Sequence, residues 1–319
     1  MTPTPSRAKI ILAFAAVYIL WGSTYLGIRY AIETLPPFLM AGTRFLTAGV
    51  ILFAWATFNG DRVNSLAHWR RAFVIGALLL LCGNGGVTWA EKYIPTGLAA
   101  LLVSTEPLWV VVLNWASTRK RPNAKVLFGV LMGLAGVALL VGGGLNNGRP
   151  ISALALAGAI VVLLAALAWA SGSVYASRRP IKVSTSLASG MQMIAGGSLL
   201  LVLALVTGDF KRLNLGAASW VSLGAFAYLL IFGSLVGFTA YSWLLRNVTT
   251  ARAATYAYVN PVVAVFLGWL LAHEPLTLRM LAAAAVIVGS VVLITTYGSD
   301  HTQPSDAIHK SECPTPPCA

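Results

Sequence analysis

The sequence predicts an all-α integral membrane protein in which ten transmembrane helices form two inverted five-helix repeats. Three observations support this fold class. Hydrophobic residues make up 58% of the chain and charged residues only 10%, whereas globular chains have about half apolar and about a quarter charged residues. Apolar runs long enough to cross a bilayer follow one another along the whole chain. Finally, the second half of the chain repeats features of the first.

Ten apolar runs define the predicted transmembrane helices. They are bounded by charged residues or by Pro and Gly, and the connections are too short for an inserted soluble domain. The first run follows Arg7 and Lys9 as a signal peptide would, but it continues without a small-residue cleavage site, so we expect a retained helix. The predicted spans are residues 10–29, 38–57, 72–90, 97–116, 126–145, 153–176, 184–206, 220–245, 253–272 and 280–297.

The residues after the last span have a different composition. From Ser299 onward the chain is polar and rich in Pro, and such a segment buries too little apolar surface to fold. We expect residues 298–319 to form a disordered cytoplasmic tail. The three cysteines, Cys82, Cys313 and Cys318, give neither a disulfide framework nor the spacing of a metal site, so we predict no metal and no cofactor.

The positions of Lys and Arg predict the orientation of the chain. Fifteen of the 22 basic residues lie on the side that holds the N-terminus, six lie on the other side, and Arg44 lies within the second span. Basic residues are enriched on the cytoplasmic side of membrane proteins, so we expect both termini in the cytoplasm. Because the net charge of +13 follows from this orientation, we expect no nucleic-acid partner.

An internal repeat appears when the chain is shifted along itself. A shift of 148 residues aligns Trp21 with Trp169, Gly42 with Gly190 and Gly49 with Gly197. A shift of 154 residues aligns Trp89 with Trp243, Pro107 with Pro261 and Trp115 with Trp269. We expect one repeat at 8–146 and a second at 150–297. Each holds five spans, an odd number, so the second enters the membrane inverted, as in many secondary transporters.

Glu106 is the outstanding candidate for chemistry. It lies in the middle of the fourth predicted span, and no other span has an acidic residue at a comparable depth. A carboxylate there costs roughly 2.5–3.5 kcal/mol on insertion scales, so it should face a wet cavity, stay protonated or pair with a cation. One reading is a site for a proton or a substrate amine; the other is a structural ion pair with Arg44.

Pro107 and Pro261 are predicted to break helices at matching places in the two halves. Each proline removes one helix hydrogen bond and leaves the carbonyl of Val103 or Ala257 without its usual donor. In a bilayer such a carbonyl needs a protein group or a water-lined cavity. Matched breaks point to a site near the middle of the membrane; the alternative is a kink that serves packing alone.

Five other side chains are candidates to line a cavity. Tyr256 and Asn260 lie on one face of the ninth predicted helix with Arg252, while Trp21 and Trp169 are repeat equivalents near the middle of their spans. Asn84 is an amide within a glycine-rich part of the third span. Aromatic stripes also occur in ordinary packing, and Tyr and Trp near helix ends also occur in interfacial belts, so these readings stay open.

Gly129 and Gly133 form a G-x-x-x-G pattern followed by Gly136, which allows helices to approach closely. We expect that contact to lie within the monomer, and the alternative is a homodimer interface. The four histidines fall in loops or the tail, and no P-loop sequence is present, so we expect neither an enzyme nor direct driving by ATP.

Two groups of motifs resemble a known family. The first half has WGSTY at 21–25, LPP at 35–37 and AGTRF at 41–45, and the second has YAYVNPVVA at 256–264, GW at 268–269 and EPLT at 274–277. Their order and spacing resemble the EamA-type branch of the drug/metabolite transporter superfamily, and within it the YedA-like bacterial inner-membrane proteins. One departure is that the family often has Glu-Pro in the ninth helix, where this chain has Asn260-Pro261.

The resemblance implies two inverted five-helix repeats around a central cavity, in the bacterial inner membrane. It also implies a secondary transporter that exports amino acids, related metabolites or drugs. The expected partners are a small-molecule substrate and the lipid bilayer. A channel and a lipid-handling membrane protein are the alternatives, and a channel should show a ring-like polar filter.

Overall fold

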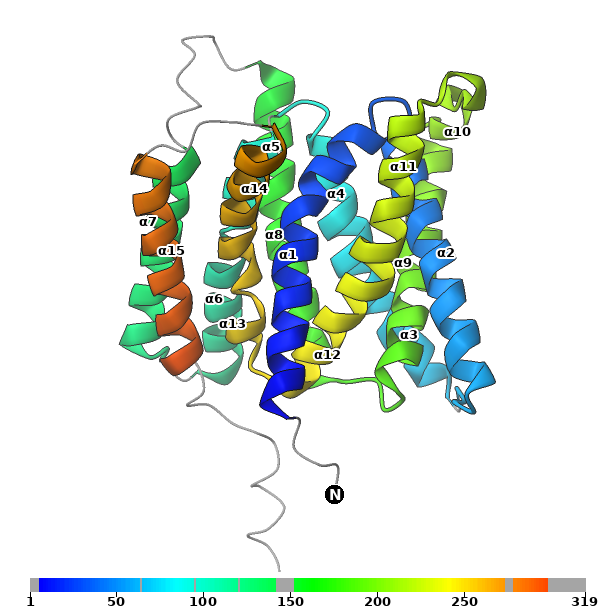
Figure 1. Cartoon of the computed structure of the whole chain (residues 1–319). Coiled ribbons are helices and arrows are strands. Elements are labelled where there is room, and N and C mark those ends of the chain that lie inside the picture. The colour runs from blue at the N-terminus through cyan, green and yellow to red at the C-terminus, as the bar shows by residue number, and fades with distance from the viewer. Residues whose placement is uncertain are drawn as a thin grey trace, which may run out of the picture.

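The computed structural model describes residues 6–63, 65–94, 96–119, 121–141, 152–272 and 278–297. Within these ranges the regular structure is helical throughout. Figure 1 shows the helices packed side by side with roughly aligned axes, whichever way each helix runs. Each helix satisfies its own backbone hydrogen-bonding groups, as a bilayer requires. The junction between the predicted repeats and the predicted C-terminal tail lie outside the described residues.

The first three helices of the chain begin at residues that favour a helix start. Ser6 and Ser65 accept hydrogen bonds from backbone N–H groups of α1 and α3, and Pro37 is the first residue of α2, where a missing N–H costs nothing. The elements are α1 (Arg7–Ala31), α2 (Pro37–Phe58), α3 (Leu66–Gly76), the π-helical η1 (Ala77–Asn84), α4 (Gly85–Ala90), α5 (Thr96–Val103), α6 (Glu106–Thr118) and α7 (Ala124–Val141).

The second half follows the same order, with capping by Ser152, Ser184, Ser219 and Thr249. Its elements are α8 (Ala153–Arg178), α9 (Thr185–Val206), α10 (Asp209–Arg212), the 3₁₀ turn η2 (Leu215–Ala217), α11 (Trp220–Tyr228), the π-helical η3 (Leu229–Phe238), α12 (Thr239–Asn247), α13 (Thr250–Ala253), α14 (Tyr256–Ala272) and α15 (Leu278–Tyr297).

Seven helical stretches of the described residues are long and apolar enough to cross a membrane: Arg7–Ala31, Pro37–Phe58, Leu66–Ala90, Leu98–Thr118, Ala153–Arg178, Thr185–Val206 and Trp220–Asn247. Two further apolar helices, Ala124–Leu139 and Leu281–Ile294, are shorter. Together with α13 and α14, these helices coincide to within a few residues with the predicted spans, apart from the earlier start of the third at Leu66. Residues 142–145 of the fifth predicted span lie outside the described residues. The chain is therefore a multi-span helical membrane protein.

Helices of the first half pack against helices of the second half in the pairs expected if a two-fold axis relates the two halves. α2 packs along α9 and α7 packs along α15, so each of these spans contacts its own repeat equivalent. α1 packs against α14, whereas α5 and α6 pack against α8. The first span of each half therefore contacts the fourth span of the other half. This reciprocity supports the internal repeat seen in the sequence.

The crossing of α2 and α9 is built from glycines that the repeat makes equivalent. A Cβ atom added to Gly197 would lie 2.5 Å from the Leu46 backbone nitrogen, and one added to Gly49 would lie 2.6 Å from that of Ile194. Gly42 lies beside Leu201 and Gly190 beside Phe53, so α2 and α9 run in opposite directions. Small residues let two helix backbones approach this closely, and the opposite directions are those that inverted repeats require.

The glycine pattern of α7 makes its contact within the chain. Gly129 lies against Leu293 and Ile294 of α15, and Gly133 lies against Ser290 of α15 and the ring of Tyr258. This is the arrangement expected from the sequence. The opposite directions of α7 and α15 are also visible at their ends, where Lys125 lies 4.1 Å from the ring centroid of Tyr297.

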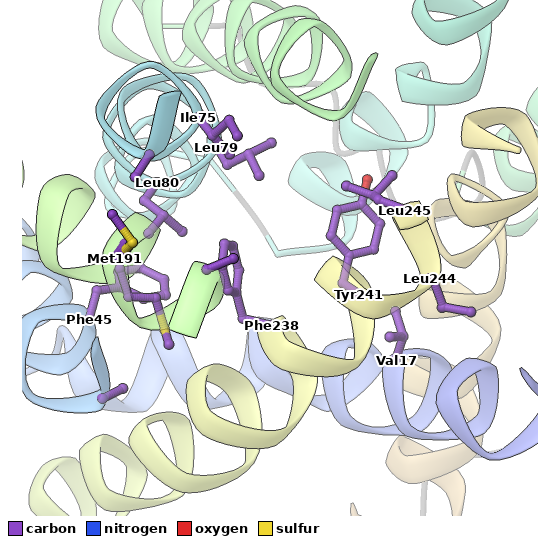
Figure 2. Close-up of a cluster of buried hydrophobic side chains, with 14 of the residues drawn as sticks. Val17, Phe45, Ile75, Leu79, Leu80, Met191, Phe238, Tyr241, Leu244 and Leu245 are labelled. Carbon is purple, nitrogen blue, oxygen red and sulfur yellow. The ribbon is translucent and has the colours of Figure 1, made fainter. Parts of the chain in front are cut away.

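The largest cluster of buried apolar side chains joins both halves. Figure 2 shows Phe238 of η3 between Phe45 and Met191 on one side and Tyr241 on the other, with Leu79 and Leu80 of η1 nearby. All of these side chains are no more than 3% exposed. Because side chains of both π-helical segments are buried in one core, η1 and η3 are held in fixed positions relative to each other.

We predict that Gly197→Ala destabilises the protein by about 1–3 kcal/mol, because the new methyl group overpacks a backbone contact. Gly49→Ala should have a similar effect. Both changes push apart the same two helices. The double variant should therefore lose less unfolding free energy than the sum of the losses in the two single variants. The measurement is thermal unfolding in detergent. Gly224→Ala in α11 is the matched control, because its Cβ would meet nothing within 4 Å. Equal melting temperatures for the Gly197→Ala and Gly224→Ala variants would contradict the proposed crossing.

Candidate functional site

A cavity of about 80 Å³ lies between the two halves. This is room for several water molecules. Its walls come from α1, α2, η1, α4, α5, α6, α8, η3 and α14. The structure brings all six predicted cavity residues to this one space: Trp21, Asn84, Glu106, Trp169, Tyr256 and Asn260.

Both π-helical segments contribute walls to the cavity. Residues 77–84 of η1 correspond under the 154-residue shift to 231–238, which lie within η3. Gly83 and Asn84 of η1 line the cavity, as do Gly233 and Phe238 of η3. π-Helical turns are uncommon and occur frequently at functional sites. The glycines around Asn84 were the only sequence signal of this irregularity, and the hydropathy pattern gave no sign of η3.

Glu106 is fully buried at the first residue of α6. Neither of its carboxylate oxygens has a hydrogen-bond partner within the described residues. The hydroxyl groups of Tyr241 and Tyr256 face the carboxylate, but not with the geometry of a hydrogen bond. The position at a helix N-terminus favours a negative charge. The carboxylate is thus held at the cavity without being neutralised by a protein cation.

Arg44 does not form the ion pair with Glu106 that one reading of the sequence predicted. Within the described ranges the structure contains one salt bridge, between Arg212 and Asp209. Arg44 Nη2 instead donates to Asn84 Oδ1 at 2.8 Å, and its guanidinium carbon lies 4.1 Å from the ring centroid of Phe45. Asn84 of η1, rather than Glu106, is therefore the hydrogen-bond partner of Arg44.

The guanidinium group nevertheless has unused hydrogen-bonding capacity. Arg44 is 2% exposed, lines the cavity, and its Nε has no partner among the described residues. The same holds for Oδ1 of Asn260, which is also 2% exposed. A buried polar group without a partner costs free energy unless water or a ligand supplies one. The cavity thus presents a carboxylate, a guanidinium group and an amide that a ligand could satisfy.

Aromatic rings form a layer in the wall of the cavity. Trp21 contacts Trp169, Tyr241 and Tyr256 with ring centroids 5.5, 5.0 and 4.9 Å apart. Trp21 Nε1 donates to the Gly233 carbonyl at 3.0 Å, so the π-helical segment also fixes this ring. The two repeat-equivalent tryptophans therefore meet at the centre of the molecule, where such contacts are stabilising.

Tyr241 belongs to this layer and was not identified from the sequence. Its hydroxyl group bonds Ser173 Oγ at 2.7 Å and accepts from Trp169 Nε1 at 3.2 Å. It lies in α12, directly after the π-helical η3. The hydropathy pattern of the sequence does not reveal this irregular segment or which face of it points inward. Tyr25, Thr24 and Ile28 of α1 were also missed as lining residues, although Tyr25 shares a helix face with Trp21.

The two predicted helix breaks are present but are not equivalent. α5 and α6 are separated at Ser104 and Thr105, just before Pro107, which is the second residue of α6. In the second half the interruption falls between α13 and α14, and Pro261 lies inside α14. The second break is therefore earlier than the position of Pro261 predicts.

The carbonyl of Ala257, which Pro261 deprives of its helix donor, receives a bond from the other half. Ser104 Oγ, at the break before Pro107, lies 2.8 Å from the Ala257 oxygen and 2.8 Å from the Ala100 oxygen of α5, so its one hydrogen is shared between the two carbonyls. This is the satisfaction by a neighbouring helix that a proline in a membrane helix needs. One residue thus connects the irregular backbone of the fourth span to that of the ninth.

We predict that Ser104→Ala destabilises the protein by about 1–3 kcal/mol, because it leaves the buried Ala257 carbonyl unpaired. Adding Pro261→Ala should restore much of this loss, since alanine supplies a backbone N–H four residues after Ala257. The melting temperatures of the two single variants and the double variant measure the coupling. Independent, additive effects would show that the Ser104 hydroxyl does not satisfy this carbonyl.

Comparisons with known proteins agree with this architecture. The model of the EamA-like transporter family matches residues 8–142 and again 156–296. The uncharacterized inner membrane transporter YedA of Escherichia coli (strain K12) is 40% identical over 284 residues, 89% of each chain. A probable amino-acid metabolite efflux pump of the same strain is 26% identical over 311 residues, 92% of this chain and 96% of that protein.

A solved crystal structure shares the fold. It superposes with a TM-score of 0.71 and 22% sequence identity, and the match covers 91% of this chain and 98% of the other. The two family matches correspond to the two halves that pack reciprocally around the cavity. The chain is therefore a membrane transporter that belongs to the EamA-like transporter family.

Proposed function

We propose that the protein is a secondary transporter that exports small metabolites, namely amino acids or related compounds, or drugs across the bacterial inner membrane by alternating access. We also propose that the chain crosses the membrane ten times, in two inverted repeats, and that both termini lie in the cytoplasm. The observation that supports it most strongly is the cavity between the halves, where Glu106 and Arg44 are buried with opposite charges and are not paired with each other.

The lining favours a substrate with both an amine and an acid group. Glu106 offers an unpaired carboxylate to an ammonium group, and Arg44 offers guanidinium N–H groups to a carboxylate. Trp21, Trp169 and Phe45 supply apolar walls and ring faces between them. An amino acid satisfies both charged groups at once. The name of the efflux-pump relative concerns the same class of metabolite.

Transport requires the cavity to open. A space for several water molecules admits a metabolite only if the lining helices or side chains move. The aromatic layer and the 2.6 Å bond between Tyr18 and Thr255 join α1 to the second half on one side of the cavity, and these contacts would have to break for that side to open. Because the two halves pack reciprocally, an equivalent movement in the other half would close the opposite side. Two such states are what alternating access needs.

A channel and a lipid-handling protein are the alternatives. Trp and Tyr rings in contact, rather than a ring of equivalent polar groups, form one wall of the cavity, which disfavours a channel. A second cavity of about 400 Å³, lined by apolar residues of α2, α10 and α11, is the feature that favours lipid. It lies apart from Glu106 and Arg44, so it does not explain the buried charges.

The proposed function is tested with three related compounds in proteoliposomes. L-Phenylalanine carries both charges, phenylethylamine only the positive one, and phenylpropionate only the negative one. We expect Glu106→Gln to weaken binding of the first two by about 10- to 100-fold, because a charge-assisted bond is worth about 1.5–3 kcal/mol. Phenylpropionate should be little affected. Arg44→Gln should show the converse pattern, weakening phenylalanine and phenylpropionate.

The variants also serve as controls for each other, since both remove one buried charge from the same cavity. A metabolite screen of cells that overproduce the protein complements the assay, with outward release or gained tolerance as the readout. No exchange of any amphoteric compound, together with ion currents in membrane patches, would favour a channel. Lipid retained in purified samples, with no exchange or currents, would favour lipid handling.

A further inference from the structure

A second buried carboxylate, that of Glu91, lies one helical turn beyond Val87, which lines the cavity. Glu91 directly follows α4, one residue beyond the membrane-spanning stretch Leu66–Ala90. It is 5% exposed, and neither of its carboxylate oxygens has a hydrogen-bond partner among the described residues. A buried, unpaired carboxylate is costly unless it is protonated or used. The packing of the fold gives no reason for its presence.

The surroundings of Glu91 contain few charges. Arg29 and Tyr25, both of α1, lie within electrostatic range. The segment around Glu91 packs against apolar residues of α5 and α8, including Ala99 and Val162. The next residue in the chain, Lys92, is exposed. One cation, Arg29, therefore acts on a carboxylate whose chain neighbours belong to an apolar cluster.

Tyr25 links this carboxylate to the cavity. It is 7% exposed and lines the cavity with Glu106. Its hydroxyl group lies within electrostatic range of both Glu91 and Glu106 and faces the amide of Asn260. Tyr25 therefore lies within electrostatic range of one carboxylate at the cavity, Glu106, and of one outside its lining, Glu91, beside a space with room for water.

We propose that Glu91 is a proton-binding site at the outer end of the cavity, from which a proton passes by Tyr25 and cavity water to Glu106. A proton from outside binds a Glu91 oxygen and moves to the Tyr25 oxygen as that hydroxyl releases its own hydrogen. Tyr25 is unchanged and Glu106 becomes protonated. When the cavity opens to the other side, Glu106 releases the proton there. The proton thus moves inward as substrate moves outward.

The electrostatics of Glu91 support this role. Burial raises the pKa of the Glu91 carboxyl group well above its usual range, and the Arg29 guanidinium opposes this effect only in part. A raised pKa means that Glu91 holds a proton at low pH and loses it as the pH rises through the raised value. That behaviour suits a group that loads a proton from an acidic outer side and delivers it to a more alkaline cytoplasm.

The first experiment tests the proton site without any substrate. Dicyclohexylcarbodiimide reacts with protonated carboxyl groups in apolar surroundings, and mass spectrometry locates the product. We expect labelling of Glu91 in the purified full chain at neutral pH, decreasing as the pH rises. Asp209 is the matched control: it is 1% exposed, but it accepts bonds from the N–H groups of Phe38 and Leu39 and pairs with Arg212. It should stay unlabelled. No labelling of Glu91 overturns the inference.

The second experiment tests coupling, which rests on the proposed function, with radiolabelled L-phenylalanine in proteoliposomes. We expect Glu91→Gln to exchange phenylalanine at equal pH within about twofold of wild type but to lose accumulation driven by a pH gradient. Glu91→Asp should keep coupling. Unchanged coupling, or loss of exchange as well, contradicts the inference. Failure of the wild type to exchange phenylalanine counts instead against the proposed substrate class, and the labelling result still decides on the proton site.

Discussion

The rest of the structure depends on one constraint, the high free-energy cost of an unpaired polar group in a medium without water. It explains why the described chain is helical and why glycines bring backbones together at the α2–α9 crossing. It also explains why the carbonyl freed by Pro261 is bonded by Ser104 from the other half. The oxygens of Glu106 and Glu91 are the exception, because no group of the described residues donates a hydrogen bond to them.

Much of the fold could be predicted because it follows from local composition. Apolar runs fixed the helices to within a few residues at most of their ends, and the repeat identified Gly49 and Gly197, which proved to lie in one crossing. The predicted cavity residues could be found because a polar or aromatic side chain in mid-span is unusual. Their assembly around one space follows from reciprocal packing of the halves.

Other features depend on tertiary contacts and could not be predicted. Arg44 bonds Asn84, the last residue of the π-helical η1, rather than Glu106, and the hydropathy of the third span does not reveal this irregular helix. The partners of Tyr241 lie about 70 residues away in the chain, so no local pattern marks it. The position of the second helix break likewise does not follow from Pro261, which lies inside α14; the preceding α13 packs against α6, α8, α12 and α15.

The central claim is that this cavity opens alternately to the two sides of the membrane. Val87 of α4 lines it, and a cysteine there, in a chain whose three native cysteines are replaced, reports access. We predict that an impermeant thiol reagent modifies Val87→Cys both in intact cells and in inverted vesicles, and that transported substrate slows both reactions. Modification from one side only, unaffected by substrate, would show a pocket that never changes sides and would contradict the account.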